Sequence, residues 1–163
     1  MPITKHIVRL PQAQLARLLM DPRAVNELVS FTVPSRDDHI DIGWSAHGLV
    51  KLAAHLPPNV RNALALVIQG EGTVADEGAF EDLYSDIKYV DAADVKRAVE
   101  ELSDADVQGF VGTVPDDPLL RTVLGAHELP DGARAYYIEQ MFAVLAFVRG
   151  AAARGLGLVV WWQ

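Results

Sequence analysis

Leu156-Gly157-Leu158-Val159-Val160-Trp161-Trp162-Gln163 closes the chain as an almost purely apolar run. Gly155 separates it from residues 135–154, whose apolar side chains recur at helical spacing. Such a run would promote aggregation if it were loose, and a chain end frays unless it is tied down. We therefore expect the run to be a buried strand of a sheet, packed under the long helix that precedes it.

The composition is that of one globular domain. With 163 residues, half of them hydrophobic and 22% charged, the chain is long enough to bury a core without a disulfide or metal. It has no cysteine, which excludes disulfides, thiolate zinc sites and iron–sulfur clusters. The first residues lack the apolar core of a signal peptide, and no apolar stretch approaches the roughly 18 residues that span a bilayer. We predict a cytoplasmic protein without a membrane partner, folded as a single domain over residues 1–163.

Local signals predict the other elements. Strands are expected at 4–10 and 87–90, and helix starts at Pro11, Pro22, Ser45, Asp91, Ser103 and Asp117. Residues 59–68 fit either a buried helix or a strand, and the acidic residues 75–85 are typical of an exposed loop. The prediction is an α+β fold: one compact domain with several helices around a small mixed sheet, closed by the long helix and the buried strand.

Three stretches carry recognisable local patterns. Residues 40–49 (IDIGWSAHGL) read as a helix entry, residues 87–95 (IKYVDAADV) as a strand and a capped helix, and residues 136–162 as a helix and a hydrophobic strand. In order and spacing they resemble the YfbM-like family of uncharacterised small bacterial proteins, whose helix entry reads Leu-Asp-Leu-x-Lys-x-Trp-x-x-Leu. The resemblance implies a single α+β domain, and it implies no established reaction, cofactor or site.

The chain departs from that family pattern at three single positions and in residues 83–86 (LYSD), where the family has a glycine-rich stretch. Trp44 stands where the family has Lys, Ala46 where it has Trp, and Lys88 where it has Arg. A family site built on that Lys, Trp and Arg is therefore not expected to carry over unchanged, and no functional residue is transferred from the resemblance.

Charge favours a protein partner over nucleic acid. The net charge is −8, and no basic run offsets it, so DNA and RNA would be repelled. An acidic band runs along residues 71–86. Our leading functional prediction is a non-enzymatic interaction protein that binds a macromolecular partner, in particular a basic protein, through the surface of Glu77, Glu81 and Asp82. The simpler explanation is that the charge keeps a small protein soluble.

Motifs for metal, nucleotide and acyl-transfer chemistry are missing from the sequence. No HExxH, G-x-S-x-G, phosphate loop or dinucleotide fingerprint occurs. His47 and His55 are eight residues apart, which on one helix separates them by about 12 Å, too far to share an ion. We predict no cofactor and no metal.

The alternative function is a small-ligand binder or hydrolase with a pocket near Asp41, His47 and Lys88. In that hypothesis Asp41 acts as a base, His47 as a proton shuttle and Lys88 as an anion contact. Aromatic side chains would complete the binding site, namely Trp44, Tyr84 and Tyr89. The oligomeric state stays open, and a homodimer is a common outcome for proteins of this kind.

Overall fold

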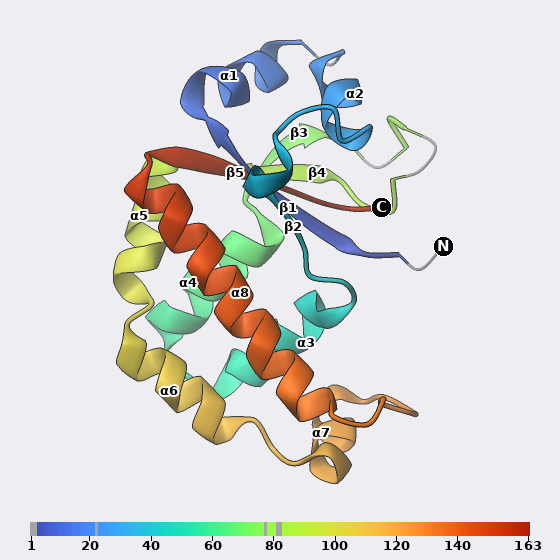
Figure 1. The fold of residues 1–163 in the computed structure, drawn as a ribbon, viewed down its shortest axis with the longest axis vertical. Coiled ribbons are helices and arrows are strands. Elements are labelled where there is room, and N and C mark those ends of the chain that lie inside the picture. Colours follow the sequence, from blue (N-terminus) through green and yellow to red (C-terminus); the bar gives the residue numbers. More distant parts are fainter. Residues whose placement is uncertain (1–2, 22, 77, 81–82) are drawn as a thin grey trace.

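The last strand of the chain lies in the middle of the sheet (Figure 1). This computed structural model describes residues 3–21, 23–76, 78–80 and 83–163. The sheet has the order β2-β1-β5-β4-β3. Its strands are β1 (Lys5–Pro11), β2 (His39–Asp41), β3 (Gly72–Ala75), β4 (Ile87–Val90) and β5 (Leu156–Trp162). β5 therefore joins the β2-β1 half of the sheet to the β4-β3 half.

The buried C-terminal strand is confirmed. Leu158, Val159, Val160 and Trp161 are all 0% exposed. β5 pairs with β1 from Leu156 to Trp162 and with β4 from Leu158 to Val160. Because both edges of the strand are hydrogen-bonded and both faces are covered, the apolar run is withdrawn from solvent and from other chains.

The sheet is antiparallel in all four of its pairings, so it is not the mixed sheet that we expected. Parallel neighbours need a crossover that brings the chain back to the edge at which the first strand began. Here the chain reaches β5 through a helix that places the strand opposite in direction to both β1 and β4. The α+β fold and the order of its last two elements are as predicted.

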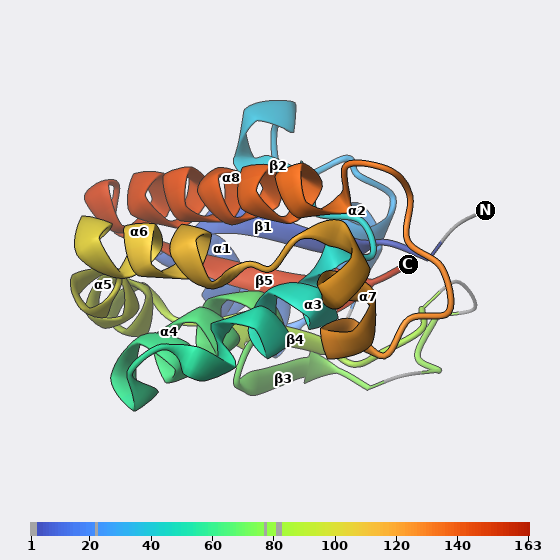
Figure 2. The same cartoon turned by 90° about the horizontal axis from the view of Figure 1, so that it is seen from below.

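Helices cover both faces of the sheet (Figures 1 and 2). On one face, α1 (Gln12–Met20) and α2 (Ala24–Val29) form the smaller apolar cluster with Val159 and Trp161. On the other face lies the larger cluster, which includes Leu158 and Val160. Its helices are α3 (Ser45–Leu52), α4 (Pro58–Gln69), α5 (Ala92–Glu101), α6 (Asp104–Thr113), α7 (Asp117–Leu124) and α8 (Ala133–Ala153), with 3-10 turns at Arg36–Asp38 and Ala53–His55 elsewhere in the chain.

Side-chain caps fix the helix starts that the sequence predicted. The Asp91 carboxylate accepts a hydrogen bond from the Asp94 backbone N–H at 2.9 Å and begins α5. Ser103 and Asp106 form a reciprocal capping box at the start of α6. Gly125 ends α7 in the left-handed conformation, with φ of 69°.

Three local expectations are corrected or decided. Residues 59–68 are helical, because Pro58 begins α4 and its stripe of Val60, Leu64 and Val67 packs into the core. Residues 72–75, expected as the end of a turn and the start of a loop, form edge strand β3 with an irregular register against β4. α2 begins at Ala24, later than expected, and the predicted start at Pro22 lies outside the described residues.

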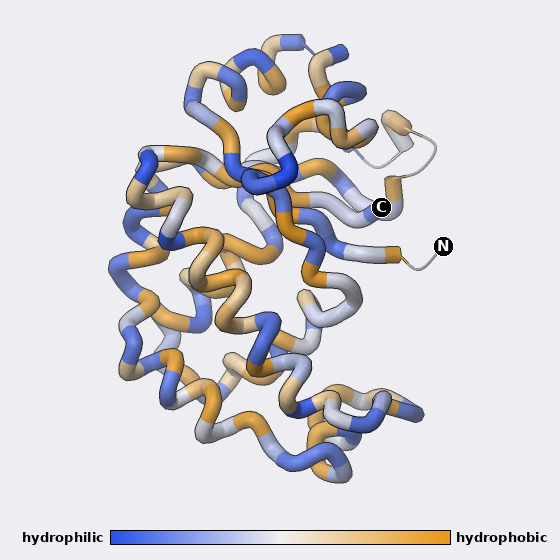
Figure 3. The backbone as a smooth tube through the Cα atoms, in the orientation of Figure 1, coloured by the Kyte–Doolittle hydropathy of each residue, from blue (hydrophilic) through white to orange (hydrophobic). Residues whose placement is uncertain are grey.

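Hydrophobic and hydrophilic positions alternate along the helices (Figure 3). This pattern is typical of helices that lie on a core with one face and meet water with the other. Within the described ranges, no helix has the length and apolar character needed to cross a bilayer.

Candidate functional site

One side of α3 lines a cavity of about 300 Å³, which we call the α3 cleft. Trp44, His47, Gly48 and Lys51 follow one another at helical spacing, so they face the same way. The opposite wall comes from the last residue of α7, Leu124, from four residues of the connection to α8, and from Tyr137 on α8. The four are Ala126, Glu128, Leu129 and Pro130. A volume of this size is at the lower end of the range for small-molecule sites.

Aromatic rings form the floor of the α3 cleft. The Trp44 ring, 44% exposed, stacks on the Tyr136 ring with 5.0 Å between centroids. It meets the Tyr137 ring edge-on at 5.5 Å. Burial, and then the neighbouring Tyr136, raise the pKa of Tyr137 to about 12, so its hydroxyl stays protonated at neutral pH. Each ring is therefore held by another ring before any ligand arrives.

Gly48 makes room for one of these rings. A Cβ atom at this position would lie 2.3 to 2.6 Å from three atoms of the Tyr137 ring and hydroxyl. Such distances are far inside van der Waals contact, so glycine is required for Tyr137 to lie against α3. The shape of the α3 cleft thus depends on one missing side chain.

Polar side chains, two of them charged, border the aromatic floor. Lys51 Nζ donates a hydrogen bond to the Leu124 carbonyl oxygen at 3.0 Å and ties α3 to the end of α7. Glu128 lines the opposite side, and the exposed His47 completes the border. The α3 cleft combines flat apolar walls with a few polar groups, which is the arrangement of small-molecule binding sites.

A second, smaller cavity meets the first at His47. This cavity, about 20 Å³, is lined by Lys5, His47, Gln69 and Trp162 among others, and we call it the Lys5 recess. The His47 ring stacks on Trp162 with 5.2 Å between centroids, and Lys5 Nζ lies 5.4 Å from the centre of the same indole. His47 therefore belongs to both cavities.

Two histidines form a pair on the opposite face of the sheet. His6 Nδ1 and His39 Nε2 lie 3.0 Å apart, and His6 Nε2 lies 3.1 Å from the Thr4 hydroxyl. Rings of Phe31 and Trp161 pack against the pair at centroid distances of 5.1 and 5.2 Å from His6. Beside it, Phe31, Pro34, Arg36 and His39 line an open cavity of about 370 Å³. The described residues contain no group of three metal-ligating side chains, here or elsewhere.

The histidine pair predicts a pH-dependent stability. Burial, as the largest cause, lowers the pKa of His6 to about 4, and burial also lowers the pKa of His39. As pH falls from about 6.5 to 4, the unfolded chain takes up a proton that folded His6 refuses, so the folded state loses stability. We expect His6 to account for part of that loss, at most about 3 kcal/mol, because solvent screens a partly buried ring.

Urea unfolding at several pH values measures this effect. The His6→Gln variant should lose much of the slope between pH 4 and 6.5, whereas His127→Gln, at an exposed loop position, should keep it. An unchanged slope in His6→Gln would show that the pair does not control acid stability.

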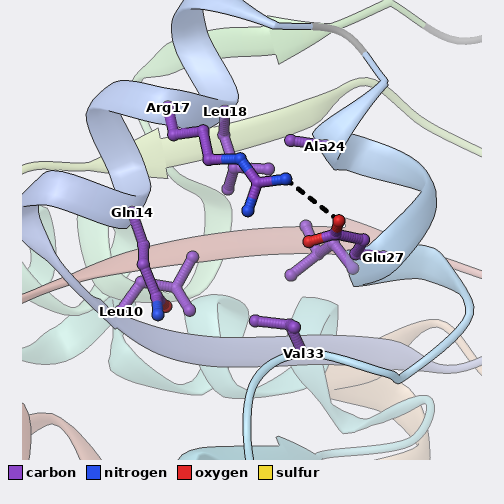
Figure 4. A pocket seen from close by; sticks show the side chains of 8 residues that line it. Leu10, Gln14, Arg17, Leu18, Ala24, Glu27 and Val33 are labelled. Atoms are coloured by element: carbon purple, nitrogen blue, oxygen red, sulfur yellow. Dashed lines mark hydrogen bonds and ion pairs between the residues drawn. The ribbon is translucent and has the colours of Figure 1, made fainter.

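A fourth cavity, between α1 and α2, is a packing gap (Figure 4). It has about 60 Å³, room for only a few water molecules. Its charged groups, Arg17 and Glu27, pair with each other across it at 3.0 Å. Because the two charged groups of this cavity already neutralise each other, the cavity offers no free charge to a ligand.

Comparison with known proteins identifies the fold. No family model and no curated protein matches the sequence. The crystal structure of YfbM from Escherichia coli, a protein of unknown function, matches with a TM-score of 0.65. The match covers 98% of this chain and 99% of that one, at 10% sequence identity.

The chain has the YfbM fold. This confirms the fold that the resemblance in the sequence predicted. Because the identity is low and the function of YfbM is unknown, the match carries no activity, ligand or site. The function of this chain has to be argued from its own residues.

The structure divides the predicted pocket residues between the two faces of the sheet. Asp41 pairs with His6 and His6 with Trp161, whereas Lys88 pairs with Val160. Asp41 therefore lies on the same face of the sheet as Trp161, and Lys88 on the same face as Val160. Because neighbouring residues in a strand point to opposite faces, Asp41 and Lys88 lie on opposite faces of the sheet. β1 and β5 also lie between their strands, which separates the backbones by roughly 14 Å. Asp41 therefore does not join His47 and Lys88 in one pocket.

The other predicted pocket residues have different surroundings. Trp44 and His47 both line the α3 cleft, and Lys88 lies near enough to Lys5 to influence its pKa. Tyr89 packs with the smaller cluster on the far face. Tyr84 is 57% exposed, and its backbone N–H donates to the Trp162 carbonyl oxygen at 3.1 Å.

The predicted partner surface lies outside the described residues. Glu77, Glu81 and Asp82 are its members, and the structure does not describe them. The hypothesis of a macromolecular partner stays a prediction, and charge reversal at these three positions in a pull-down tests it.

Sequence reasoning missed Lys5, Tyr137 and the histidine pair as site residues. Tyr137 is on the predicted apolar stripe of α8, and its exposure to a cavity depends on Gly48, a contact between distant segments. His6 and His39 meet because β1 pairs with β2, a contact between segments that are 33 residues apart in the sequence. The burial of Lys5 follows from the pairing of β1 with β5, which the sequence around Lys5 does not encode.

Proposed function

We propose that the protein binds a small, planar organic molecule in the α3 cleft. One observation carries the proposal: the Trp44 ring stands 44% exposed at a cavity of about 300 Å³, already stacked on Tyr136. A large exposed ring at a cavity presents a flat apolar surface that a ligand ring covers at little ordering cost. The proposal is for binding and includes no reaction.

The charges around the α3 cleft favour a ligand with a polar edge. Its ring would lie against Trp44 and Tyr137, and its polar groups would meet His47, Lys51 and Glu128. Lys51 has donor capacity left, because an ammonium has three protons and the hydrogen bond to the Leu124 carbonyl uses one of them. This arrangement supports a ligand with both hydrogen-bond donors and acceptors.

Nuclear magnetic resonance of the three tryptophan indole N–H groups tests the proposal. In a screen of planar water-soluble fragments, binding in the α3 cleft should shift the Trp44 signal. The Trp161 signal should stay in place, since that residue is 0% exposed on the other face of the sheet and its indole N–H donates to the Gln163 side chain. Shifts confined to signals outside the α3 cleft would contradict the proposal.

Replacement of the exposed ring gives a quantitative prediction. Trp44→Ala should weaken the best fragment about tenfold, which corresponds to about 1.4 kcal/mol of lost ring contact. The matched control is Phe142→Ala on α8, since Phe142 is 45% exposed and is not among the cleft-lining residues. Equal losses in the two variants would mean that binding is non-specific.

A further inference from the structure

We propose that the open cavity beside the histidine pair binds a small aromatic carboxylate, with Arg36 as the contact for the carboxylate and Phe31 as the contact for the ring. Phe31, Pro34, Arg36 and His39 line this cavity, which we call the Phe31 cavity. None of the four lines the α3 cleft, so the proposal does not require the α3 cleft to bind a ligand.

The Phe31 cavity has room for a single ring with one substituent. Its volume is about 370 Å³, compared with about 300 Å³ for the α3 cleft. An apolar cavity of roughly 150 Å³ is enough to hold a benzene molecule. Size therefore admits a monocyclic acid, and the class of ligand follows from the side chains around the space.

Phe31 occupies a backbone position that favours glycine. It directly follows the end of α2 with φ of 56°, and among the described residues every other positive φ belongs to a glycine. This conformation costs free energy for a residue with a side chain, and such residues cluster at ligand sites. The Phe31 ring packs on His6 and His39 at centroid distances of 5.1 and 5.2 Å, yet it stays 46% exposed. A ligand ring in the cavity would cover apolar surface that the protein leaves in water.

Arg36 supplies a positive charge that the neighbouring carboxylates leave free. Asp38 accepts hydrogen bonds at 2.6 Å from Arg9 Nε and from Arg154 Nη1, so two other cations already share its charge. In the described part of the chain, neither Arg36 nor Asp37 forms an ion pair. A guanidinium presents paired N–H groups that match the two oxygens of a carboxylate. Because Arg36 is exposed, the contact would form in solvent and be modest in strength.

His39 fixes the direction in which the ligand lies. Its Nε2 is 3.0 Å from His6 Nδ1, whereas no hydrogen bond reaches its Nδ1 in the described part of the chain. Burial, the largest cause, lowers the pKa of His39, so its ring is neutral at pH 7, and the charge of Asp41 acts in the opposite direction. A neutral ring near a carboxylate does not attract an anion. The ligand carboxylate would therefore lie at Arg36, with the ring toward Phe31 and His39.

The charge of the lining favours a carboxylate over a phosphate. Arg36 is the one full cation among the described residues that line the Phe31 cavity. A phosphate monoester carries about −1.5 to −2 charges at pH 7, so part of its charge would stay unmatched in a protein of net charge −8. A carboxylate carries a single charge, which one guanidinium matches.

Titration with sodium benzoate at constant ionic strength, followed by the backbone amide signals in NMR, tests the site. Benzoate should shift the amide signals of Phe31, Arg36 and His39. Benzyl alcohol keeps the ring and lacks the charge, so it should shift the same signals and bind more weakly than benzoate. The indole N–H signal of Trp44 reports separately on the α3 cleft.

Two variants separate the charge contact from the ring contact. Arg36→Gln should weaken benzoate about fivefold, the scale of an exposed ion pair, and leave benzyl alcohol unchanged. Its matched control, Arg61→Gln, removes an exposed arginine from α4 and should alter neither affinity. Phe31→Gly should weaken both ligands. Glycine adopts a φ of 56° readily, so this variant is expected to stay folded, and the spread of its amide signals checks that.

Three results would overturn the proposal. They are amide signals of Phe31, Arg36 and His39 that stay in place at every benzoate concentration, equal benzoate affinity in wild type and Arg36→Gln, and benzyl alcohol binding as tightly as benzoate. Tighter binding of phenyl phosphate than of benzoate would overturn the choice of a carboxylate. The Trp44 signal enters none of these outcomes, so the Phe31 cavity and the α3 cleft are tested independently.

Discussion

A chain that stops at Gly155 is expected to be unfolded. The deletion removes β5, and with it the hydrogen bonds to both β1 and β4. It also removes the fully buried Leu158, Val159, Val160 and Trp161. At about 1.5–3 kcal/mol for each buried side chain, the lost burial is roughly as large as the total stability of a typical domain. Circular dichroism and the spread of amide signals in NMR would show the loss of the folded state.

A single substitution provides a graded form of this test. Trp161→Ala should lower the free energy of unfolding by about 3–5 kcal/mol, because it opens a cavity at a fully buried position. Trp44→Ala, at a residue that is 44% exposed, should cost much less. If the truncated chain stayed folded, or if the two substitutions cost the same, β5 would not be the centre of the sheet.

Gly48→Ala is expected to destabilise the protein by about 1–3 kcal/mol and to close the α3 cleft. The added Cβ would overlap the Tyr137 ring, as its 2.3 Å approach indicates, so the ring has to leave its place. A glycine-to-alanine change inside a helix ordinarily stabilises the protein, since alanine is favoured over glycine there by about 1 kcal/mol. The expected destabilisation is therefore opposite to the ordinary effect. The free energy of unfolding in urea measures the change.

A double-mutant cycle identifies the cause. In the Tyr137→Ala background the ring is absent, so Gly48→Ala should become neutral or stabilising. Such a change in the effect of Gly48→Ala on the free energy of unfolding would show that its cost comes from the contact with the Tyr137 ring. If Gly48→Ala cost the same in both backgrounds, Tyr137 would not be the residue that requires glycine at position 48.

The fold was predictable to the extent that its signals are local. The apolar run before the chain end, the caps at Asp91 and Ser103 and the glycine at 125 each act within a few residues, and all four are confirmed. The direction of the strands depends on which strands become neighbours, and short segments do not encode that. Edge strand β3 was missed for a similar reason, because it is short and is formed by pairing with β4.

The candidate site was predictable only in part. Trp44 and His47 share a helix face, and that spacing is visible in the sequence. Asp41 is three residues from Trp44, yet it lies in β2 opposite His6 and is not among the residues that line the α3 cleft. Tyr137 becomes part of the α3 cleft through its contact with Gly48, and Lys5 becomes part of the Lys5 recess through its contact with Trp162. Both contacts link segments that are far apart in the sequence. Which polar side chains converge is thus decided by tertiary packing.

A crystal structure of the protein soaked with planar fragments tests the central claim most directly, since it locates each ligand atom. We predict fragment density stacked on Trp44 and reaching His47, bounded by Tyr137 and the 124–130 connection. Fragments that gather at other cavities, such as the one beside Phe31 and His39, while the α3 cleft stays unoccupied in every soak, would contradict it.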